Sequence, residues 1–151
     1  MIELLSPAGK MENLKFAFMY GADAVYLGGQ DFSLRANAQN FSIDEIKEAT
    51  GYAHEYNKKV YVTVNIVFHN EDLKGLKEYL IKLDEIGIDA IIASDITVIK
   101  YANELECKFD VHLSTQASCL NSNAVKFWQS LGVKRIVLAR EASREDIIEI
   151  K

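Results

Sequence analysis

The stretch Gly21-Ala22-Asp23-Ala24-Val25-Tyr26-Leu27 decides the fold, because it joins a helix-ending glycine, a short polar step and a buried strand. The same order recurs in Gly87-Ile88-Asp89-Ala90-Ile91-Ile92-Ala93 and in Gly132-Val133-Lys134-Arg135-Ile136-Val137-Leu138. Glycine suits the left-handed residue that ends many helices, since it has no Cβ atom to clash. The run after each glycine is almost continuously apolar, which is typical of a strand covered on both faces in a parallel sheet.

Helical and extended patterns alternate along the rest of the chain. Further strands are predicted at Ile2–Leu5, Val60–Val64 and Val111–Leu113. Helices are predicted over 10–20, over 42–56 with a Ser42/Glu45 capping box, over 71–86 with Asn70 as cap, and over 96–105, 122–131 and 143–150. These are about six strand–helix units, and strands joined by helices form parallel sheets through right-handed crossovers.

Two α/β architectures fit this order. A doubly wound sheet would be complete at 151 residues, whereas a (β/α) barrel of TIM type typically needs about 250. The first strand–helix turn, Ser6-Pro7-Ala8-Gly9-Lys10, lacks the Gly-x-Gly-x-x-Gly loop of dinucleotide-binding folds. The sequence therefore favours an incomplete barrel, with residues 1–151 forming the N-terminal part of one barrel domain.

Composition narrows the possible functions. No apolar run approaches the roughly 18 residues of a membrane helix, and Met1–Leu5 does not resemble a signal peptide, so we expect a cytoplasmic protein. Cys107 and Cys119 can form neither a disulfide framework nor a close metal-binding pair, and we expect reduced thiols and no metal site. A net charge of −5 argues against a broad basic surface, although a local basic patch stays compatible with it.

Polar residues follow the predicted strands, at the end where barrel enzymes carry their chemistry. Together they predict a substrate-binding pocket built from Arg35, Asn65, Asp95, His112, Gln116, Arg140 and Glu141. Arg35 is the strongest single candidate, because a guanidinium in a loop suits carboxylate or phosphate recognition. Two others have structural alternatives: Asp95 as the cap of the helix at 96, and Asn65 as a partner for loop backbone groups.

The remaining candidates also have structural alternatives. Arg140 and Glu141 could form an ion pair with each other. His112 lies inside a strand, where it could be a core histidine. No Ser/His/Asp spacing, His-Glu-x-x-His motif or cysteine cluster marks a hydrolase or a metal site, so the catalytic residues stay unassigned.

Taken in order, these segments resemble peptidase family U32. The resemblance spans nearly the whole chain and rests on Glu3–Gly9, Tyr20–Gly29, Phe32–Arg35, Val64-Asn65, Asp89–Asp95, His112–Gln116 and Val137–Glu141. The stretch Lys126–Gln129 is most similar to the branch that contains tRNA uridine hydroxylation proteins and collagenase-like proteases. The resemblance implies a longer parent protein that binds an iron–sulfur cluster through cysteines downstream of this region, to which Cys107 and Cys119 do not correspond.

Three hypotheses follow from the resemblance. The first is an iron–sulfur-dependent tRNA uridine hydroxylation enzyme, of which this chain alone would be inactive. The second is a metal-dependent collagenase-like peptidase with a peptide substrate. The third is a structural module, whose open first and last strands we expect to pair with another copy.

Overall fold

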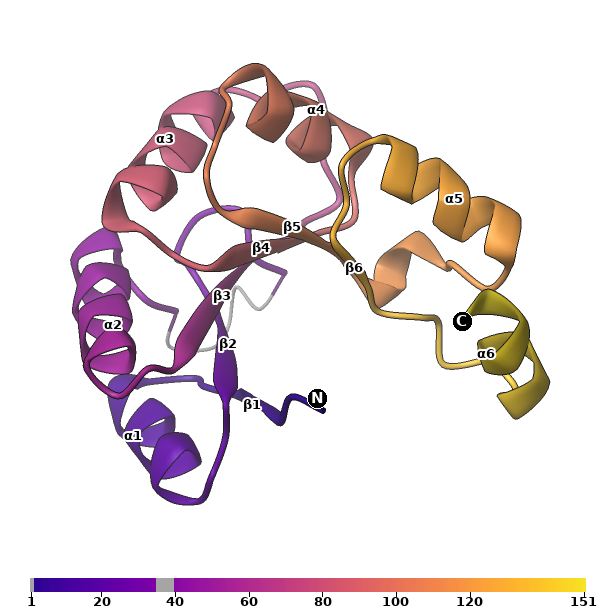
Figure 1. Ribbon diagram of the computed structural model, residues 1–151. Helices are drawn as coiled ribbons and strands as arrows, with labels where there is room; N and C mark the ends of the chain where they lie inside the picture. The colour runs from indigo at the N-terminus through magenta and orange to yellow at the C-terminus, as the bar shows by residue number, and fades with distance from the viewer. Residues whose placement is uncertain (1, 35–39) are drawn as a thin grey trace.

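The computed structural model describes residues 2–34 and 40–151 and shows one curved, six-stranded parallel sheet in the order β1-β2-β3-β4-β5-β6. The strands curve around an inner side, and the helices lie on the outer side (Figure 1). The elements are β1 Leu5–Pro7, α1 Met11–Met19, β2 Ala24–Gly28, α2 Ile43–Glu55, β3 Lys59–Val64, α3 Leu76–Ile86, β4 Ala90–Ala93, α4 Ile96–Glu104, β5 Asp110–Leu113, η1 Thr115–Ala117, α5 Ser122–Ser130, β6 Arg135–Ile136 and α6 Arg144–Ile150. This sequential order of parallel strands is that of a TIM-type barrel wall, and it confirms the predicted incomplete barrel.

The glycine-led stretches form as the sequence predicts. Gly21, Gly87 and Gly132 have φ angles of +97°, +80° and +87°, the left-handed region that glycine enters without a steric penalty. Ser42 and Glu45 form the predicted capping box of α2, and Ser143 caps α6 in the same way with Asp146. Local sequence therefore determines most helix ends.

Three predicted boundaries are wrong. The first strand begins at Leu5 instead of Ile2, because the ladder with β2 starts at the pair Leu5 and Ala24. Asn70 does not cap a helix at 71: Gly75, with φ +80°, is the N-cap of a later α3. The last strand is only Arg135–Ile136, and β5 is its one partner among the strands that the structure describes.

Side chains on the two faces of the sheet enter different environments. Residues such as Val25, Val62 and Ile91 face the helices and join the main hydrophobic core. Alternate residues, including Ala24, Tyr61 and Ile92, form a second, smaller cluster. Because side chains alternate along a strand, the second set lies on the inner side, where polar residues also gather.

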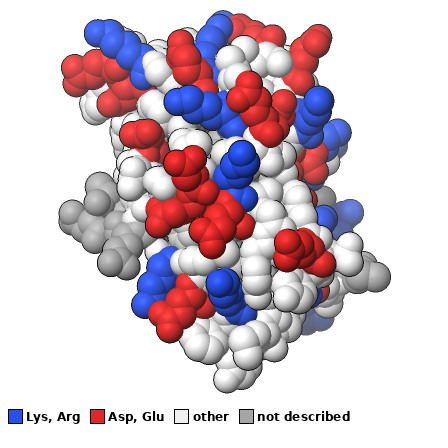
Figure 2. All heavy atoms as spheres, turned by 90° about the vertical axis from the view of Figure 1, so that its left-hand side faces the viewer, with Lys and Arg blue, Asp and Glu red and all other residues white. Residues whose placement is uncertain are grey.

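The outer helical face carries mixed charge. Figure 2 shows acidic and basic side chains interspersed over the face that lies on the left in Figure 1. No helix among residues 2–34 and 40–151 is long and apolar enough to cross a membrane.

Candidate substrate-binding site

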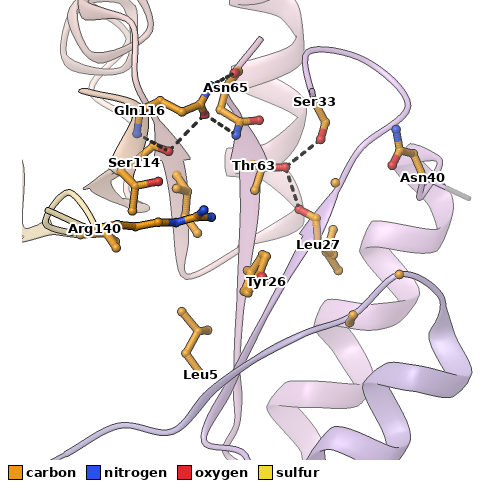
Figure 3. A pocket seen from close by; sticks show the side chains of 16 residues that line it. Leu5, Tyr26, Leu27, Ser33, Asn40, Thr63, Asn65, Ser114, Gln116 and Arg140 are labelled. Carbon is orange, nitrogen blue, oxygen red and sulfur yellow. Dashed lines mark hydrogen bonds between the residues drawn. The ribbon is translucent and has the colours of Figure 1, made fainter. Parts of the chain in front are cut away.

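A cavity of about 350 Å³ lies on the inner side of the sheet, at the carboxyl ends of the strands (Figure 3). We call it the mouth pocket. Its lining includes the apolar residues Leu5, Tyr26, Leu27, Ile92 and Val137. Its polar lining consists of Ser33, Asn40, Thr63, Asn65, Ser114, Thr115, Gln116 and Arg140. A cavity of this size, mostly apolar with a few convergent polar groups, suits a small ligand or one flipped-out base.

The structure brings together three of the predicted site residues. Asn65 follows β3, Gln116 lies in η1 after β5, and Arg140 follows β6, and all three line the mouth pocket. They meet because the strands are parallel and neighbouring in order, so their carboxyl ends share one edge of the sheet. Arg35 lies outside the described residues.

The other predicted site residues do not line the mouth pocket. Asp95 caps α4 instead, since its Oδ1 atom accepts a hydrogen bond of 2.7 Å from the Thr97 amide. Glu141 is exposed, and the described residues include no ion pair between it and Arg140. His112 is buried on the inner side of β5, outside the pocket lining.

Asn65 and Gln116 hold each other in place. The Asn65 Nδ2 atom donates to Gln116 Oε1 at 2.8 Å, and Gln116 Nε2 donates to the Asn65 backbone carbonyl at 3.4 Å. The Ser114 hydroxyl adds a bond of 3.2 Å to the same Gln116 oxygen. This network links β3 to the end of β5, and it fixes both amide groups without any ligand (Figure 3).

Sequence reasoning missed a hydroxyl pair that lies beside Asn65 in the pocket. Ser33 Oγ and Thr63 Oγ1 lie 2.9 Å apart, and Thr63 donates to the Leu27 carbonyl at 3.2 Å. The alternation of Tyr61, Thr63 and Asn65 along β3 could have revealed Thr63, because residues two apart face the same side. No local signal places Ser33 there, since it reaches the pocket from a loop.

Gly28, which ends β2, and Gly29, which follows it, allow this loop to approach. A Cβ atom on Gly28 would lie 2.5 Å from Ser33 Oγ, and one on Gly29 would lie 2.1 Å from the Tyr79 hydroxyl oxygen. A larger residue at position 28 would push the Ser33 loop away from the sheet, and one at position 29 would displace the Tyr79 side chain on α3. Gly28 and Gly29 therefore shape the pocket without contributing side chains to it.

Arg140 is the basic group of the pocket lining. Its side chain extends toward the centre of the pocket in Figure 3, and no described carboxylate forms an ion pair with it. No aspartate, glutamate, histidine or cysteine belongs to the described lining. The pocket can therefore attract an anionic or carbonyl-bearing ligand, but its described lining offers no general base.

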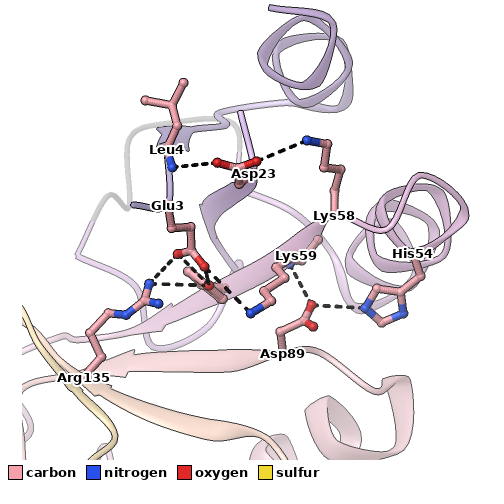
Figure 4. Close-up of polar contacts among 10 residues, drawn as sticks. Glu3, Leu4, Asp23, His54, Lys58, Lys59, Asp89 and Arg135 are labelled. Atoms are coloured by element: carbon pink, nitrogen blue, oxygen red, sulfur yellow. Dashed lines mark hydrogen bonds and ion pairs between the residues drawn. The ribbon is translucent and has the colours of Figure 1, made fainter. Parts of the chain in front are cut away.

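The amino-terminal ends of the same strands carry a different group of side chains, shown in Figure 4. We call Glu3, Lys59, Tyr61 and Arg135 the N-terminal cluster. Arg135 donates a hydrogen bond to the Glu3 carboxylate, and the Tyr61 hydroxyl donates another to Glu3 Oε1 at 2.8 Å. The Lys59 Nζ atom lies 3.8 Å from Glu3 Oε2. The Arg135 hydrogen bond holds the pKa of Glu3 below its ordinary value. These contacts connect the segment before β1 to β6 across the inner side.

His112 packs beside this cluster as a core histidine. Its ring contacts the Tyr61 ring edge-on, with centroids 4.7 Å apart. Burial, and after it the positive charge of Arg135, lowers the pKa of His112 to about 4. Burial also raises the pKa of Tyr61 to about 12, with the Glu3 carboxylate adding to the effect. His112 is therefore neutral at physiological pH, and it is a poor candidate for an acid or base.

The described residues do not fit an iron–sulfur cluster. Cys107 and Cys119 are both free, and burial raises the pKa of each thiol, which disfavours the thiolate that binds iron. No group of three or more histidine, cysteine or acidic side chains gathers in the described ranges in a way that could hold a metal ion.

Comparison with known proteins decides the family. A family model described as peptidase family U32 matches residues 9–151. The chain belongs to peptidase family U32. It is 48% identical to "tRNA hydroxylation protein P1" of Bacillus subtilis over 99% of this chain, and 37% identical to "23S rRNA 5-hydroxycytidine C2501 synthase" of Escherichia coli over 97%. It is also 34% identical to a "Collagenase" of Porphyromonas gingivalis over 96%.

The U32 chain is short beside its relatives. It spans 35%, 22% and 34% of these three proteins in the same order. A solved structure of a U32 peptidase superimposes with a TM-score of 0.79 at 13% identity, covering 99% of this chain and 64% of the other. The structural likeness supports the barrel fold, and the sequence likeness supports the family.

Proposed function

We propose that this U32 chain forms the substrate-binding part of a cytoplasmic enzyme that hydroxylates uridine in tRNA. The observation that carries the proposal is the mouth pocket. It combines amide donors, the Tyr26 ring and Arg140, which has no ion-pair partner among the described residues, at the strand ends where barrel enzymes carry their chemistry. Single-stranded RNA bases are bound by such combinations of stacking surfaces and hydrogen-bonding edges. Relatives named as tRNA and rRNA hydroxylation proteins support the same reaction class.

The alternative is proteolysis, which the collagenase relative suggests. Peptidases need a nucleophile paired with a base, or a metal-bound water. The described lining of the mouth pocket contains no histidine, cysteine or carboxylate that could play such a part. This chemistry favours RNA modification over peptide hydrolysis.

The test is nucleoside analysis of tRNA from a strain that lacks the gene. Loss of hydroxylated uridine, restored by the wild-type gene, is the expected result. Gelatin zymography of the protein encoded by the whole gene, with and without a chelator, tests the alternative. Unchanged tRNA together with chelator-sensitive gelatin cleavage would refute the proposal.

We also propose that any iron–sulfur cluster of the enzyme is held by residues outside these 151. Cys119 is buried and Cys107 is partly buried, and neither gathers with other possible metal ligands among the described residues. The chain alone should therefore contain no stoichiometric iron after anaerobic reconstitution and should not hydroxylate tRNA. Iron bound by the 151-residue chain, or hydroxylation by it, would contradict this part of the proposal.

The open edges of the sheet make self-association of the isolated chain a further part of the proposal. Within residues 2–34 and 40–151, β1 and β6 each pair on one side only, which leaves backbone groups without a strand partner on both edges. Ile2 and Leu4 precede β1, Ile147 and Ile148 lie on α6, and all four are exposed. Light scattering of the isolated chain should give a mass above one copy, and a monomer at high concentration would contradict it.

A further inference from the structure

The amide groups of the mouth pocket present donors to a ligand. The Gln116 carbonyl oxygen accepts from both Asn65 Nδ2 and the Ser114 hydroxyl, which uses its two lone pairs. Asn65 Nδ2 and Gln116 Nε2 each spend one hydrogen within the network and keep another. The Asn65 Oδ1 atom accepts from the Leu34 amide at 3.3 Å, and with the Arg140 guanidinium beside the two amides this wall offers mainly N–H groups.

The hydroxyl pair of Thr63 and Ser33, beside Asn65, presents acceptors. Thr63 gives its single hydroxyl hydrogen to the Leu27 carbonyl at 3.2 Å. Ser33 must then be the donor in the 2.9 Å contact with Thr63, so both hydroxyl hydrogens are spent. Lone pairs remain on both oxygens. Ser33 is only 7% exposed, so solvent has little access to this pair.

We propose that these two walls read the edge of a pyrimidine and select uracil over cytosine. This inference rests on the proposed function and names the base-selecting residues of the same site. Uracil offers a carbonyl at C4 and an N–H at N3, whereas cytosine offers an amino group at C4 and a bare N3. The donor wall of Asn65 and Gln116 matches the C4 carbonyl, and the Thr63 and Ser33 oxygens match the N3 hydrogen.

Cytosine reverses both contacts. Its amino group would meet the amide hydrogens, and its N3 lone pair would meet hydroxyl oxygens that have no hydrogen left to give. The polar side chains of the pocket cannot rotate to suit cytosine without breaking the hydrogen bonds that they make to one another. Binding of the wrong base therefore costs free energy. Tyr26 and Ile92 supply apolar surface that any base can contact, so the polar edge decides the selection.

The experiment compares uridine 5′-monophosphate, 3-methyluridine 5′-monophosphate and cytidine 5′-monophosphate, titrated into the protein encoded by the whole gene. The 3-methyl compound lacks the N3 hydrogen but keeps both carbonyls. Uridine 5′-monophosphate is expected to bind at least about tenfold more tightly than either of the others. It should also shift the side-chain amide NMR signals of Asn65 and Gln116.

Thr63→Val isolates the hydroxyl contact, since valine keeps the shape of threonine and removes the oxygen. The uridine and 3-methyluridine nucleotides should then bind within about twofold of each other. Thr50→Val is the matched control, because the Thr50 hydroxyl is also buried and donates to the Ile46 carbonyl at 2.8 Å, on α2 away from the pocket. It should leave the selectivity unchanged. If Thr63→Val fails to fold in a thermal melt, Ser33→Ala replaces it with the same expected result.

Equal binding of the three nucleotides, or no binding of any, would overturn the inference. This failure can be told apart from failure of the proposed function. If the deletion strain loses hydroxylated uridine but the purified protein does not discriminate between the nucleotides, only the base-selection inference is wrong. If the strain keeps its hydroxylated uridine while the nucleotides are discriminated, the hydroxylation proposal is wrong and the pocket assignment stands.

Discussion

The mouth pocket and the N-terminal cluster occupy opposite ends of the same curved sheet, and they differ in whether their charged side chains form ion pairs. In the N-terminal cluster, the Glu3 carboxylate has three partners on two different strands, Lys59 and Tyr61 on β3 and Arg135 on β6. In the mouth pocket, Arg140 has no carboxylate partner among the described residues. Charges that satisfy one another hold a fold together, whereas an unsatisfied group in a cavity remains available to a ligand. The comparison assigns stability to one end and binding to the other.

His112 provides the largest test on the stability side. Its pKa falls from 6.5 to about 4 on folding. Between these two pH values His112 is therefore protonated in the unfolded chain and neutral in the folded chain. The free energy of unfolding should therefore decrease as pH falls from 6.5 toward 4, by at most about 3 kcal/mol from this group. In urea titrations at several pH values, His112→Asn should remove this slope. His69→Asn, on the surface, controls for the loss of one histidine, and an unchanged slope in His112→Asn would contradict the assignment.

Arg140 provides the largest test on the binding side. Arg140→Met should weaken uridine 5′-monophosphate binding about thirtyfold, or about 2 kcal/mol, and reduce its salt dependence, because a charge-assisted contact is lost. The unfolding midpoint should hardly change, since Arg140 is exposed and has no described ion-pair partner. Arg144→Met on α6 is the matched control. Equal affinity in the two variants would remove Arg140 from the site.

Glu3 tests the N-terminal cluster itself. Glu3→Gln keeps the size of the side chain but removes the charge that Arg135 and Lys59 approach. Arg135 remains 40% exposed, so solvent screening limits the loss of unfolding free energy to about 1–2 kcal/mol. Because the pKa of Glu3 is lowered, its contribution should be present above pH 4.5 and be lost as the pH falls below that value.

Glu12→Gln is the control for Glu3→Gln. Glu12 pairs with Lys10 at 2.8 Å, but both side chains are more than half exposed. This surface pair should contribute little, so the variant should unfold almost like the wild type. If Glu12→Gln lost as much unfolding free energy as Glu3→Gln, the contacts of Glu3 would stabilise the fold no more than a surface ion pair does.

Asp95 gives the smallest expected effect and separates a helix cap from a ligand. Asp95→Ala should lower the free energy of unfolding by about 1 kcal/mol through loss of the cap of α4. Asp95→Asn should restore most of it, since asparagine also caps helices. Neither variant should alter nucleotide binding. If Asp95→Ala weakened nucleotide binding and Asp95→Asn did not restore it, Asp95 would be a ligand-binding residue.

The sequence could predict the polar ends of the strands but could not predict which of them converge. Asn65, Gln116 and Arg140 line one pocket, because strand ends of a parallel barrel meet at one rim, and their role in substrate binding stays a prediction. Asp95 and Glu141 occupy equivalent positions along the chain, yet one caps a helix and the other faces solvent. Position after a strand does not fix the direction of a side chain, which depends on how each loop leaves the sheet.

By itself, the sequence determined the fold, because glycine-ended helices and continuous apolar strands are local patterns with few physical solutions. It also determined the family, through motifs that run in order along nearly the whole chain. Only the tertiary structure decided which residues of the inner face form the mouth pocket and which form the N-terminal cluster. Glu3 meets Arg135 across 132 positions, and Ser33 meets Thr63 across 30. Such contacts depend on the curvature of the sheet and on the close approach allowed by Gly28 and Gly29, which no local pattern encodes.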